Sequence, residues 1–229
     1  QDVAAIIVEP VAANMGVVVP EPGFLASLRE IADERGALLI FDEVVTGLRL
    51  GPGGYQDIAG LRPDITCLGK VMGGGLPVGA YGGRRALMEQ VSPAGPVYQA
   101  GTLAGNPLAV AAGLATLDRL DALRPWEALE RTAASLAEGI RKQLGGRPGC
   151  VQRVGSMMTL FFGIERAGSW ADAERNDRDR FAAFFAALLE QGVWIPPSPF
   201  ESWFVSTAHS QEDIERTIEA VGVALASSD

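Results

Sequence analysis

The sequence is poor in cysteine and histidine and contains no long apolar run. Its two cysteines, Cys67 and Cys150, stand alone, so no disulfide framework and no metal site are expected. No stretch of about 18 apolar residues occurs, and the first residues carry neither a basic segment nor a cleavage signal. Lysine and arginine do not cluster, and the formal net charge is −9, which argues against a nucleic acid or a membrane as partner. We therefore expect a cytoplasmic enzyme that acts on a small molecule.

The first part of the chain alternates short apolar runs with an amphipathic segment. The runs at residues 3–10, 37–41 and 64–68 have the length and composition of parallel strands that are covered on both faces. Between the first two, residues 22–35 place apolar side chains at helical spacing, and Gly36 follows as a helix-ending residue. This alternation predicts an α/β fold with parallel strand pairing.

Helical patterns dominate the rest of the chain. Asn106 and Pro107 have the order of a helix cap and first helical residue, and the next 13 residues are apolar nearly all round, which predicts a buried helix. Further on, the pattern predicts helices at 126–144, 179–191 and 214–225 and a strand at 157–164. The change in composition within this part predicts two domains, residues 1–120 and residues 121–229.

Lys70 stands between an apolar run and a segment dense in glycine, "GKVMGGGLPVGAYGG". A phosphate-binding P-loop would need glycine at position 64 and serine or threonine at position 71, where the sequence has Asp64 and Val71. The G-x-G-x-x-G pattern of dinucleotide-binding folds is also absent. Taken alone, a lysine in such a place is most often a solvated surface residue.

Asp42 gives Lys70 a second interpretation. Each follows the carboxyl end of a predicted parallel strand, and α/β sheets bind their ligands at that edge. A lysine and a carboxylate in one pocket suit pyridoxal 5'-phosphate (PLP), because the lysine can bond covalently to the cofactor and the carboxylate can keep the pyridine nitrogen protonated. The alternative for Asp42 is a turn or capping residue at a strand end.

Several longer motifs resemble those of one family. "VEPVAANMG", "LLIFDEVVTGLR", "PDITCLGKVMGGGLPVGAYGG" and "YQAGTLAGNPLAVAAG" are similar to segments of the class III, fold-type I, PLP-dependent aminotransferases, as is the late "PPSPFESWFVSTAHS". The resemblance runs over nearly the whole chain. It implies the C-terminal part of a large, mostly parallel-sheet PLP-binding domain at 1–120, followed by a smaller α+β domain at 121–229.

The resemblance also implies roles for particular residues. Lys70 matches the lysine that carries PLP and moves the proton during amino transfer, and Asp42 matches the partner of the pyridine nitrogen. Val44 matches the residue that packs against one face of the ring. Thr102 matches a threonine that binds the phosphate of the partner subunit's cofactor, which implies a homodimer.

Two further positions are implied on the substrate side. Asn14 in "ANMG" and Glu201 in "PFES" match polar residues near cofactor and substrate, although either would also suit an ordinary turn or surface position. Ala13 stands where the family usually has glycine before that asparagine, and Pro199 stands where it has another residue, often glutamine, before Phe-Glu; either change could alter the substrate contacts. His209, the only histidine, is given no catalytic role.

Within this family the motifs are most similar to the aminomutase branch. That similarity implies an intramolecular amino transfer on an amino aldehyde, converting glutamate-1-semialdehyde to 5-aminolevulinate. Two alternatives stay open: a class III transaminase that acts on two substrates, and a non-catalytic half that acts by dimerisation. The family's phosphate cradle, ring-stacking aromatic residue and substrate-binding arginine would all precede residue 1, so we expect this chain expressed alone to be poorly soluble or to bind PLP weakly.

Overall fold

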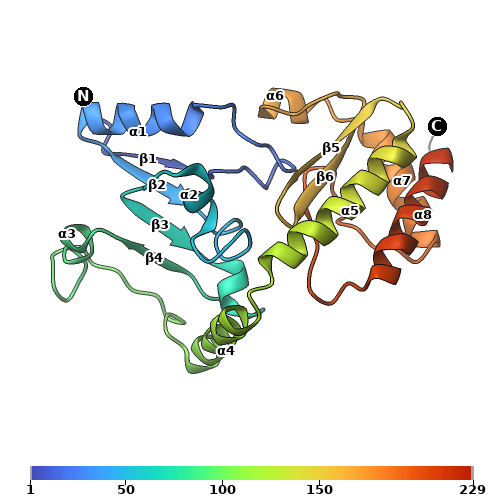
Figure 1. Cartoon of the computed structure of the whole chain (residues 1–229). Coiled ribbons are helices and arrows are strands. Elements are labelled where there is room, and N and C mark those ends of the chain that lie inside the picture. Colours follow the sequence, from blue (N-terminus) through green and yellow to red (C-terminus); the bar gives the residue numbers. More distant parts are fainter. Residues whose placement is uncertain (1, 228–229) are drawn as a thin grey trace. The chain divides into compact units, whose positions relative to one another are not determined.

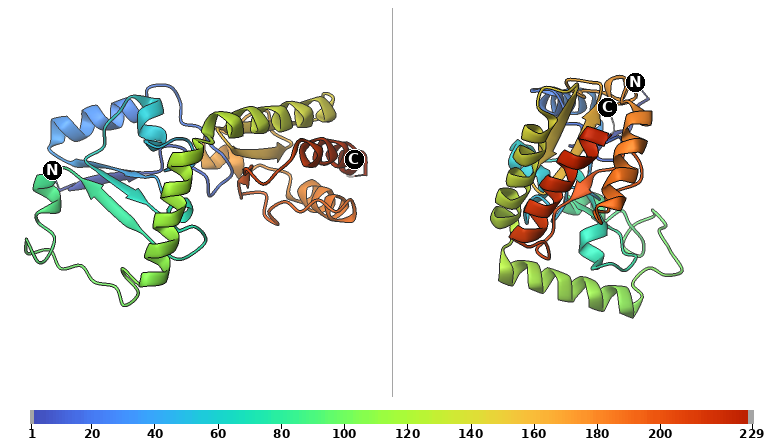
Figure 2. Two further views of the ribbon diagram at one scale, coloured as in Figure 1. Left: turned by 60° about the horizontal axis from the view of Figure 1, so that its bottom comes forward. Right: turned by 90° about the vertical axis from the view of Figure 1, so that its right-hand side faces the viewer.

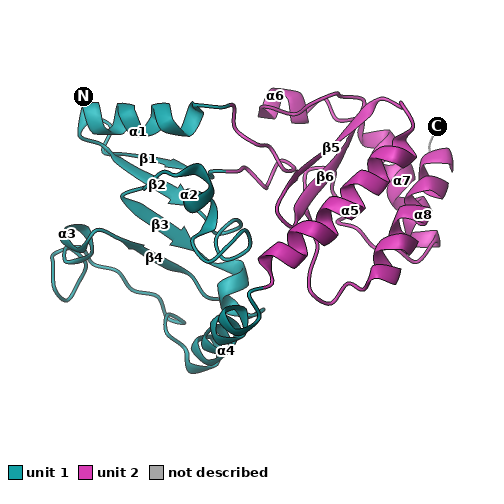
Figure 3. Ribbon diagram, in the orientation of Figure 1, with its two compact units in different colours: residues 1–10, 22–124 teal, residues 11–21, 125–229 magenta. Residues whose placement is uncertain are grey.

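A computed structural model describes residues 2–227, and these form two compact units (Figure 3). Unit 1 comprises residues 2–10 and 22–124, and unit 2 comprises residues 11–21 and 125–227. The sequence-based division into domains at 120/121 stays a prediction; the units add that residues 11–21 belong with the C-terminal part of the chain. Among the described helices, none combines the length and the apolar character needed to cross a membrane.

Unit 1 is built on a four-stranded sheet in the order β1 (Ala5–Val8), β2 (Leu38–Asp42), β3 (Ile65–Leu68) and β4 (Ala80–Gly83) (Figure 1). The first three strands run parallel, and β4 is antiparallel to β3. The three apolar runs of the sequence form the three parallel strands, which confirms the predicted α/β class. β4 was not predicted, because its short "AYGG" sequence contains two glycines and lacks the apolar pattern of a strand.

Helix α1 (Phe24–Arg35) connects β1 to β2 and packs against both strands. Its buried Leu25 and Ala32 form a small core with Leu39 and Phe41 of β2. Full burial of a leucine or phenylalanine side chain contributes about 2 kcal/mol, so this cluster holds the helix on the sheet. Gly36 ends the helix in the left-handed conformation, at φ 67°, as the sequence predicts.

Four further helical segments belong to unit 1. They are α2 (Gly54–Ala59), the 3-10 helix η1 (Lys70–Gly73), α3 (Arg85–Met88) and α4 (Pro107–Leu123). The first three are too short to carry a helical repeat of apolar residues, and none of them was predicted. The start of α4 was predicted: the Asn106 side chain accepts a hydrogen bond from the N–H of Ala109, 3.0 Å away, and Pro107 is the first helical residue.

The predicted burial of α4 is wrong. Only Ala109 and Gly113 of this helix are buried, whereas Leu108 is 75% exposed and Leu114 57% exposed. α4 packs on η1 through small residues: a Cβ at Gly113 would lie 3.0 Å from the carbonyl oxygen of Met72. The larger apolar side chains project away from this narrow contact, which leaves them uncovered in the described part of the chain.

β1 also differs from the expectation of a strand covered on both faces. Alternate residues of the strand are exposed, and Ile7 is 64% exposed. β1 pairs only with β2, so it is the edge strand of the described sheet. An apolar run therefore predicted the strand correctly but not its degree of burial.

Unit 2 contains a three-stranded antiparallel sheet, β5 (Gly149–Val154), β6 (Met157–Phe162) and β7 (Trp203–Phe204), together with four helices. α5 and α8 pack side by side, and α7 lies next to α8 (Figure 2). The helices are α5 (Trp126–Leu144), α6 (Trp170–Ala173), α7 (Arg178–Glu190) and α8 (Gln211–Ser227). The three long helices and β6 were predicted, and the unit has the α+β character implied by the resemblance.

The core of unit 2 lies between its long helices and its sheet. Every residue of β6 is buried, and Phe162 meets the edge of Phe184 of α7 with ring centroids 5.2 Å apart. Leu188 of α7 and Leu225 of α8 are also fully buried in this cluster. The helical spacing of apolar residues in the sequence thus identified this core, because each predicted helix has one buried face.

Asp64 joins four elements of unit 1. One of its carboxylate oxygens accepts the N–H of Leu39 at 2.8 Å and the guanidinium of Arg29 at 2.9 Å, and the other pairs with Arg84 at 2.8 Å. Burial opposes ionisation of this side chain, but the hydrogen bonds from Leu39 and Arg29 and the charges of both arginines outweigh it, so the pKa of Asp64 lies below its ordinary value. A carboxylate whose pKa is lowered by folding stabilises the fold above its unfolded pKa of about 4, and this contribution is lost as the pH falls through the folded pKa.

We expect Asp64→Asn to lower the free energy of unfolding of unit 1 by about 1 to 3 kcal/mol at pH 7, because Arg29 and Arg84 lose a buried charged partner. The difference from wild type should shrink as the pH falls below about 4. All four tryptophans lie in residues 125–227 and report on unit 2, so the measurement is hydrogen–deuterium exchange of peptides from β2 and β3. Asp121→Asn is the control, since that exposed residue pairs only with Arg124 at the surface. Equal exchange in the two variants would refute the role of Asp64.

Candidate active site

Asp42 and Lys70 belong to neighbouring strand ends of unit 1. Asp42 is the last residue of β2, and its register partner in β3 is Cys67, three positions before Lys70. Because β2 and β3 run parallel, both strands end at the same edge of the sheet. The structure therefore brings the two predicted residues to the edge where α/β proteins bind their ligands.

Lys70 has an unusual backbone conformation. Its φ is 44°, and Leu48 and Arg124 are the other described residues besides glycine with a positive φ. This region is disfavoured for residues with a Cβ atom and costs of order 1 kcal/mol, so the surrounding structure must hold the residue there. Lys70 is exposed and begins η1 directly after β3, a position consistent with a functional side chain at the sheet edge.

Val44 lies beside both residues. The N–H of Val44 donates to the carboxylate of Asp42 at 3.1 Å, closing a tight turn after β2. Its side chain lies over Gly69, where a Cβ atom would be 3.3 Å from Val44 Cγ1. The carboxylate, an apolar side chain and the backbone before Lys70 are thus neighbours, as the sequence analysis predicts.

Thr102 lies in an exposed turn, residues 101–104, that leads into α4. α4 lies close to the backbone of the segment after Lys70: a Cβ at Gly74 would lie 2.2 Å from the hydroxyl oxygen of Thr116 and 3.0 Å from the carbonyl oxygen of Ala112. Gly74, in the glycine-dense segment after Lys70, therefore leaves room for this helix.

Asn14 and Glu201 belong to unit 2 and lie in adjoining loops. The N–H of Gly16 donates to the carbonyl oxygen of Phe200 at 2.6 Å, and the hydroxyl of Ser202 donates to the carbonyl oxygen of Ala13 at 2.9 Å. These two bonds flank the predicted residues, and both side chains are exposed. The structure brings Asn14 and Glu201 together although they are 187 positions apart in the sequence (201 − 14), and it places Lys70, Asp42, Val44 and Thr102 in unit 1.

Glu43 is a polar residue beside the site that the sequence analysis did not single out. It follows Asp42 directly, and none of its surface is exposed. The sequence did contain one indication of its position. Side chains alternate along an extended chain, so Glu43 is expected on the face opposite its neighbour Asp42. A carboxylate on that covered side needs hydrogen-bond donors, and sequence alone does not show where they come from.

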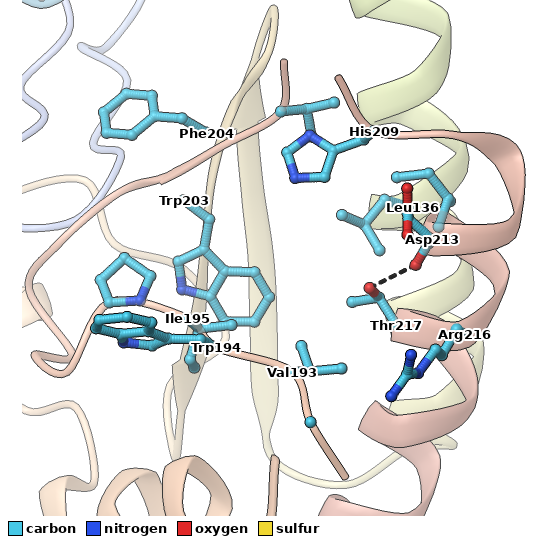
Figure 4. A pocket seen from close by; sticks show the side chains of 14 residues that line it. Leu136, Val193, Trp194, Ile195, Trp203, Phe204, His209, Asp213, Arg216 and Thr217 are labelled. Atoms are coloured by element: carbon cyan, nitrogen blue, oxygen red, sulfur yellow. Dashed lines mark hydrogen bonds between the residues drawn. The ribbon is translucent and has the colours of Figure 1, made fainter. Parts of the chain in front are cut away.

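Two further cavities lie away from the predicted residues. One in unit 1, of about 320 Å³, is lined by Glu43 and by glycines of the loop before α2. The other, in unit 2, has a volume of about 310 Å³. Figure 4 shows Trp194 and Trp203 on one side of it and Asp213, Arg216 and Thr217 of α8 on the other. Neither cavity contains Lys70, Asp42, Asn14 or Glu201 in its lining.

The chain matches the family model described as Aminotransferase class-III over residues 1–221, and it belongs to this family. Glutamate-1-semialdehyde 2,1-aminomutase of Thermomicrobium roseum is 62% identical over 98% of this chain and 53% of the length of that protein. An omega-transaminase from Sphaerobacter thermophilus has a similar structure, with a TM-score of 0.87 and 32% identity over 98% of this chain and 52% of that one. A glutamate-1-semialdehyde aminomutase from Pseudomonas aeruginosa PAO1, solved in complex with PMP, gives a TM-score of 0.88 and 30% identity over 99% and 52%.

The chain spans about half the length of the curated relatives it matches. The family resemblance found in the sequence motifs is confirmed by the family model and the relatives. The two structures confirm the fold class, since their similarity extends over nearly all of this chain.

Cys67 offers a chemical probe of Asp42. Burial raises the pKa of the Cys67 thiol, and the negative charge of Asp42 raises it further. Cys150, the only other cysteine, lies in unit 2, where burial raises its pKa to about 11. Since the thiolate is the reactive form, the rate of alkylation at each cysteine reports its pKa.

We expect Asp42→Asn to lower the pKa of Cys67 and to speed its alkylation by iodoacetamide at weakly alkaline pH. The rate at Cys150 should not change, because its pKa is set by other neighbours. Mass spectrometry of the two cysteine peptides over a range of pH measures both rates in one sample. A pH–rate profile of Cys67 that is identical in the variant and the wild type would show that Asp42 does not act on the end of β3.

Proposed function

We propose that the protein containing this chain is a PLP-dependent aminomutase that converts glutamate-1-semialdehyde to 5-aminolevulinate, a step of tetrapyrrole biosynthesis. The observation that carries the proposal is the position of Asp42 and Lys70 at the ends of two adjacent parallel strands. The identity of 62% to an aminomutase over nearly the whole chain supports the choice of reaction within the family.

The residues at this edge fit PLP chemically. Lys70 supplies an amine for covalent attachment, Asp42 supplies a carboxylate for the protonated pyridine nitrogen, and Val44 supplies an apolar surface for one face of the ring. The hydrogen bond from the N–H of Val44 to Asp42 closes the turn after β2, and the surrounding structure holds Lys70 at positive φ after β3. When bound, PLP supplies the electron sink that makes the proton on the amine-bearing carbon acidic enough to leave.

The side chains then divide the work of amino transfer. Lys70 holds the cofactor at rest, and its released amine takes up and returns the proton that moves during the reaction. Asp42 keeps a positive charge on the pyridine nitrogen, because the carboxylate favours the protonated form of a neighbouring base. From the family resemblance, Asn14 and Glu201 in the two adjoining loops of unit 2 are the candidates for polar contacts to cofactor or substrate.

We also propose a homodimer in which Thr102 binds the phosphate of the partner's cofactor. Support comes from the exposed turn that carries Thr102 and from the uncovered apolar side chains around it, such as Leu103 and Leu108. Apolar surface of this kind marks association sites in soluble proteins. A reducing location, the cytoplasm, fits the two free cysteines.

A second candidate is an ordinary class III transaminase. The omega-transaminase structure and the aminomutase structure are about equally similar to this chain, with 32% against 30% identity and TM-scores of 0.87 against 0.88. In addition, Ala13 before Asn14 and Pro199 two positions before Glu201 differ from the residues usual in the family, and both lie near the proposed substrate contacts. Both candidates would use Lys70, Asp42 and Thr102, so only the substrate distinguishes them.

An assay without a second amino acceptor separates the two candidates. We expect the full protein, incubated with glutamate-1-semialdehyde alone, to form 5-aminolevulinate over many turnovers. A transaminase would form product only when an amino donor and an oxo acid are both supplied. Absence of 5-aminolevulinate would exclude the aminomutase while leaving the PLP site intact.

Reduction with borohydride tests the cofactor site itself. We expect the full protein loaded with PLP to carry the reduced adduct on the peptide that contains Lys70, and we expect Lys70→Ala to lose the adduct and at least about 10³-fold in activity. Lys142 is the only other lysine in the sequence and is exposed on α5, so Lys142→Ala should behave as wild type. An unmodified Lys70 peptide would favour a non-catalytic protein.

A further inference from the structure

Glu43 is a fully buried carboxylate between two residues of the proposed cofactor site. It follows β2 directly, and its own N–H donates to the carbonyl oxygen of Cys67 at 3.0 Å, which continues the pairing of β2 with β3. A buried carboxylate is costly unless it is fully hydrogen-bonded, and removing its partners leaves an uncompensated charge. The environment of Glu43 therefore indicates what the side chain does.

Four donors surround the Glu43 carboxylate. The hydroxyl of Thr46 donates to Oε2 at 2.9 Å, and the N–H of Tyr55 donates to the same oxygen at 2.6 Å. Gln56 donates to Oε1 twice, from its backbone N–H at 3.1 Å and from its side-chain amide at 3.3 Å. The carboxylate thus binds both the turn that follows it and the first turn of α2.

The network extends to β3. The side-chain amide of Gln56 also lies 3.2 Å from the hydroxyl of Thr66 in β3, within hydrogen-bond distance. A Cβ at Gly54 would lie 2.3 Å from Glu43 Oε2, and φ at Gly54 is 69°, so only glycine fits there without strain. The Glu43 carboxylate therefore contacts the loop of residues 44–54 near its start, through Thr46, and at its end, through the N–H of Tyr55.

We propose that Glu43 is a positioning residue for the cofactor site: its anchored carboxylate fixes the backbone from which Asp42 and Val44 project. This inference rests on the proposed function. Because Glu43 projects from the opposite face of the chain, it acts through these two neighbours. A shift of the end of β2 would move the Asp42 carboxylate away from the pyridine nitrogen and the Val44 side chain away from the ring. Binding and catalytic geometry tolerates only small displacements of such groups.

Glu43→Gln tests this role in the full protein. The glutamine has the same shape, but its amide nitrogen replaces one acceptor and faces N–H donors. We expect the apparent dissociation constant for PLP, from absorbance titration of the apoprotein, to rise about 10- to 100-fold, by analogy with the loss of an outer hydrogen-bond partner of a metal ligand. We expect kcat to fall while KM for the substrate changes little, because Glu43 positions Asp42 and Val44 at the cofactor ring and does not contact the substrate. Glu34→Gln on α1 makes the same change at an exposed residue and should behave as wild type.

Thr46 provides a second pair of variants if Glu43→Gln does not fold. Thr46→Val keeps the shape and removes the hydroxyl donor to Glu43, whereas Thr46→Ser keeps the donor. We expect Thr46→Val to weaken PLP binding severalfold and Thr46→Ser to retain most of the affinity.

The outcomes separate this inference from the proposed function. If wild type and Glu34→Gln bind PLP on Lys70 and the Glu43 and Thr46 variants bind it equally well, with only a lower melting temperature, Glu43 is a structural clamp and this inference alone is refuted. If the wild-type protein does not bind PLP on Lys70, both the proposed function and this inference are refuted.

Discussion

The parallel pairing of β2 with β3 is the constraint on which the proposed site depends. Asp42, the last residue of β2, lies opposite Cys67 near the end of β3, and Lys70 follows β3 after Gly69. A slip of one residue would move every side chain of β3 to the other face of the sheet. The backbone hydrogen bonds between β2 and β3 therefore determine whether the lysine and the aspartate lie close enough to act on one cofactor.

Two buried carboxylates fix this pairing from opposite ends. Asp64 precedes β3 and accepts the N–H of Leu39 near the start of β2, and arginines from α1 and from the end of β4 neutralise it. Glu43 follows β2 and is satisfied by neutral donors, among them Thr46 and the backbone of Gln56. Asp64 is thus stabilised mainly by ion pairs with arginines, whereas Glu43 is stabilised by hydrogen bonds from uncharged groups.

The sequence predicted the elements of the fold better than their surroundings. Apolar runs and helical spacing identified the three parallel strands and the long helices, because these patterns reflect local backbone geometry and one buried face. The burial of α4 was predicted wrongly, since an apolar helix indicates only that something covers it. β4 was missed because its pairing with β3 is determined by the neighbouring strand and not by its own glycine-rich sequence.

The residues of the candidate site also differ in how well the sequence predicted them. Lys70 and Asp42 were found from their positions after strand ends, a signal that each carries in its own neighbourhood. Glu43 was not found, because its donors come from a loop and a short helix whose path has no periodic pattern.

Asn14 and Glu201 show a third case, in which nearness depends on tertiary contacts alone. Residues 11–21 leave unit 1 after β1 and join unit 2, and main-chain and hydroxyl bonds to the loop at 200–202 hold them there. The chain therefore passes between the units three times, so the proposed substrate-side residues are carried by a different folded unit from the lysine and the aspartate.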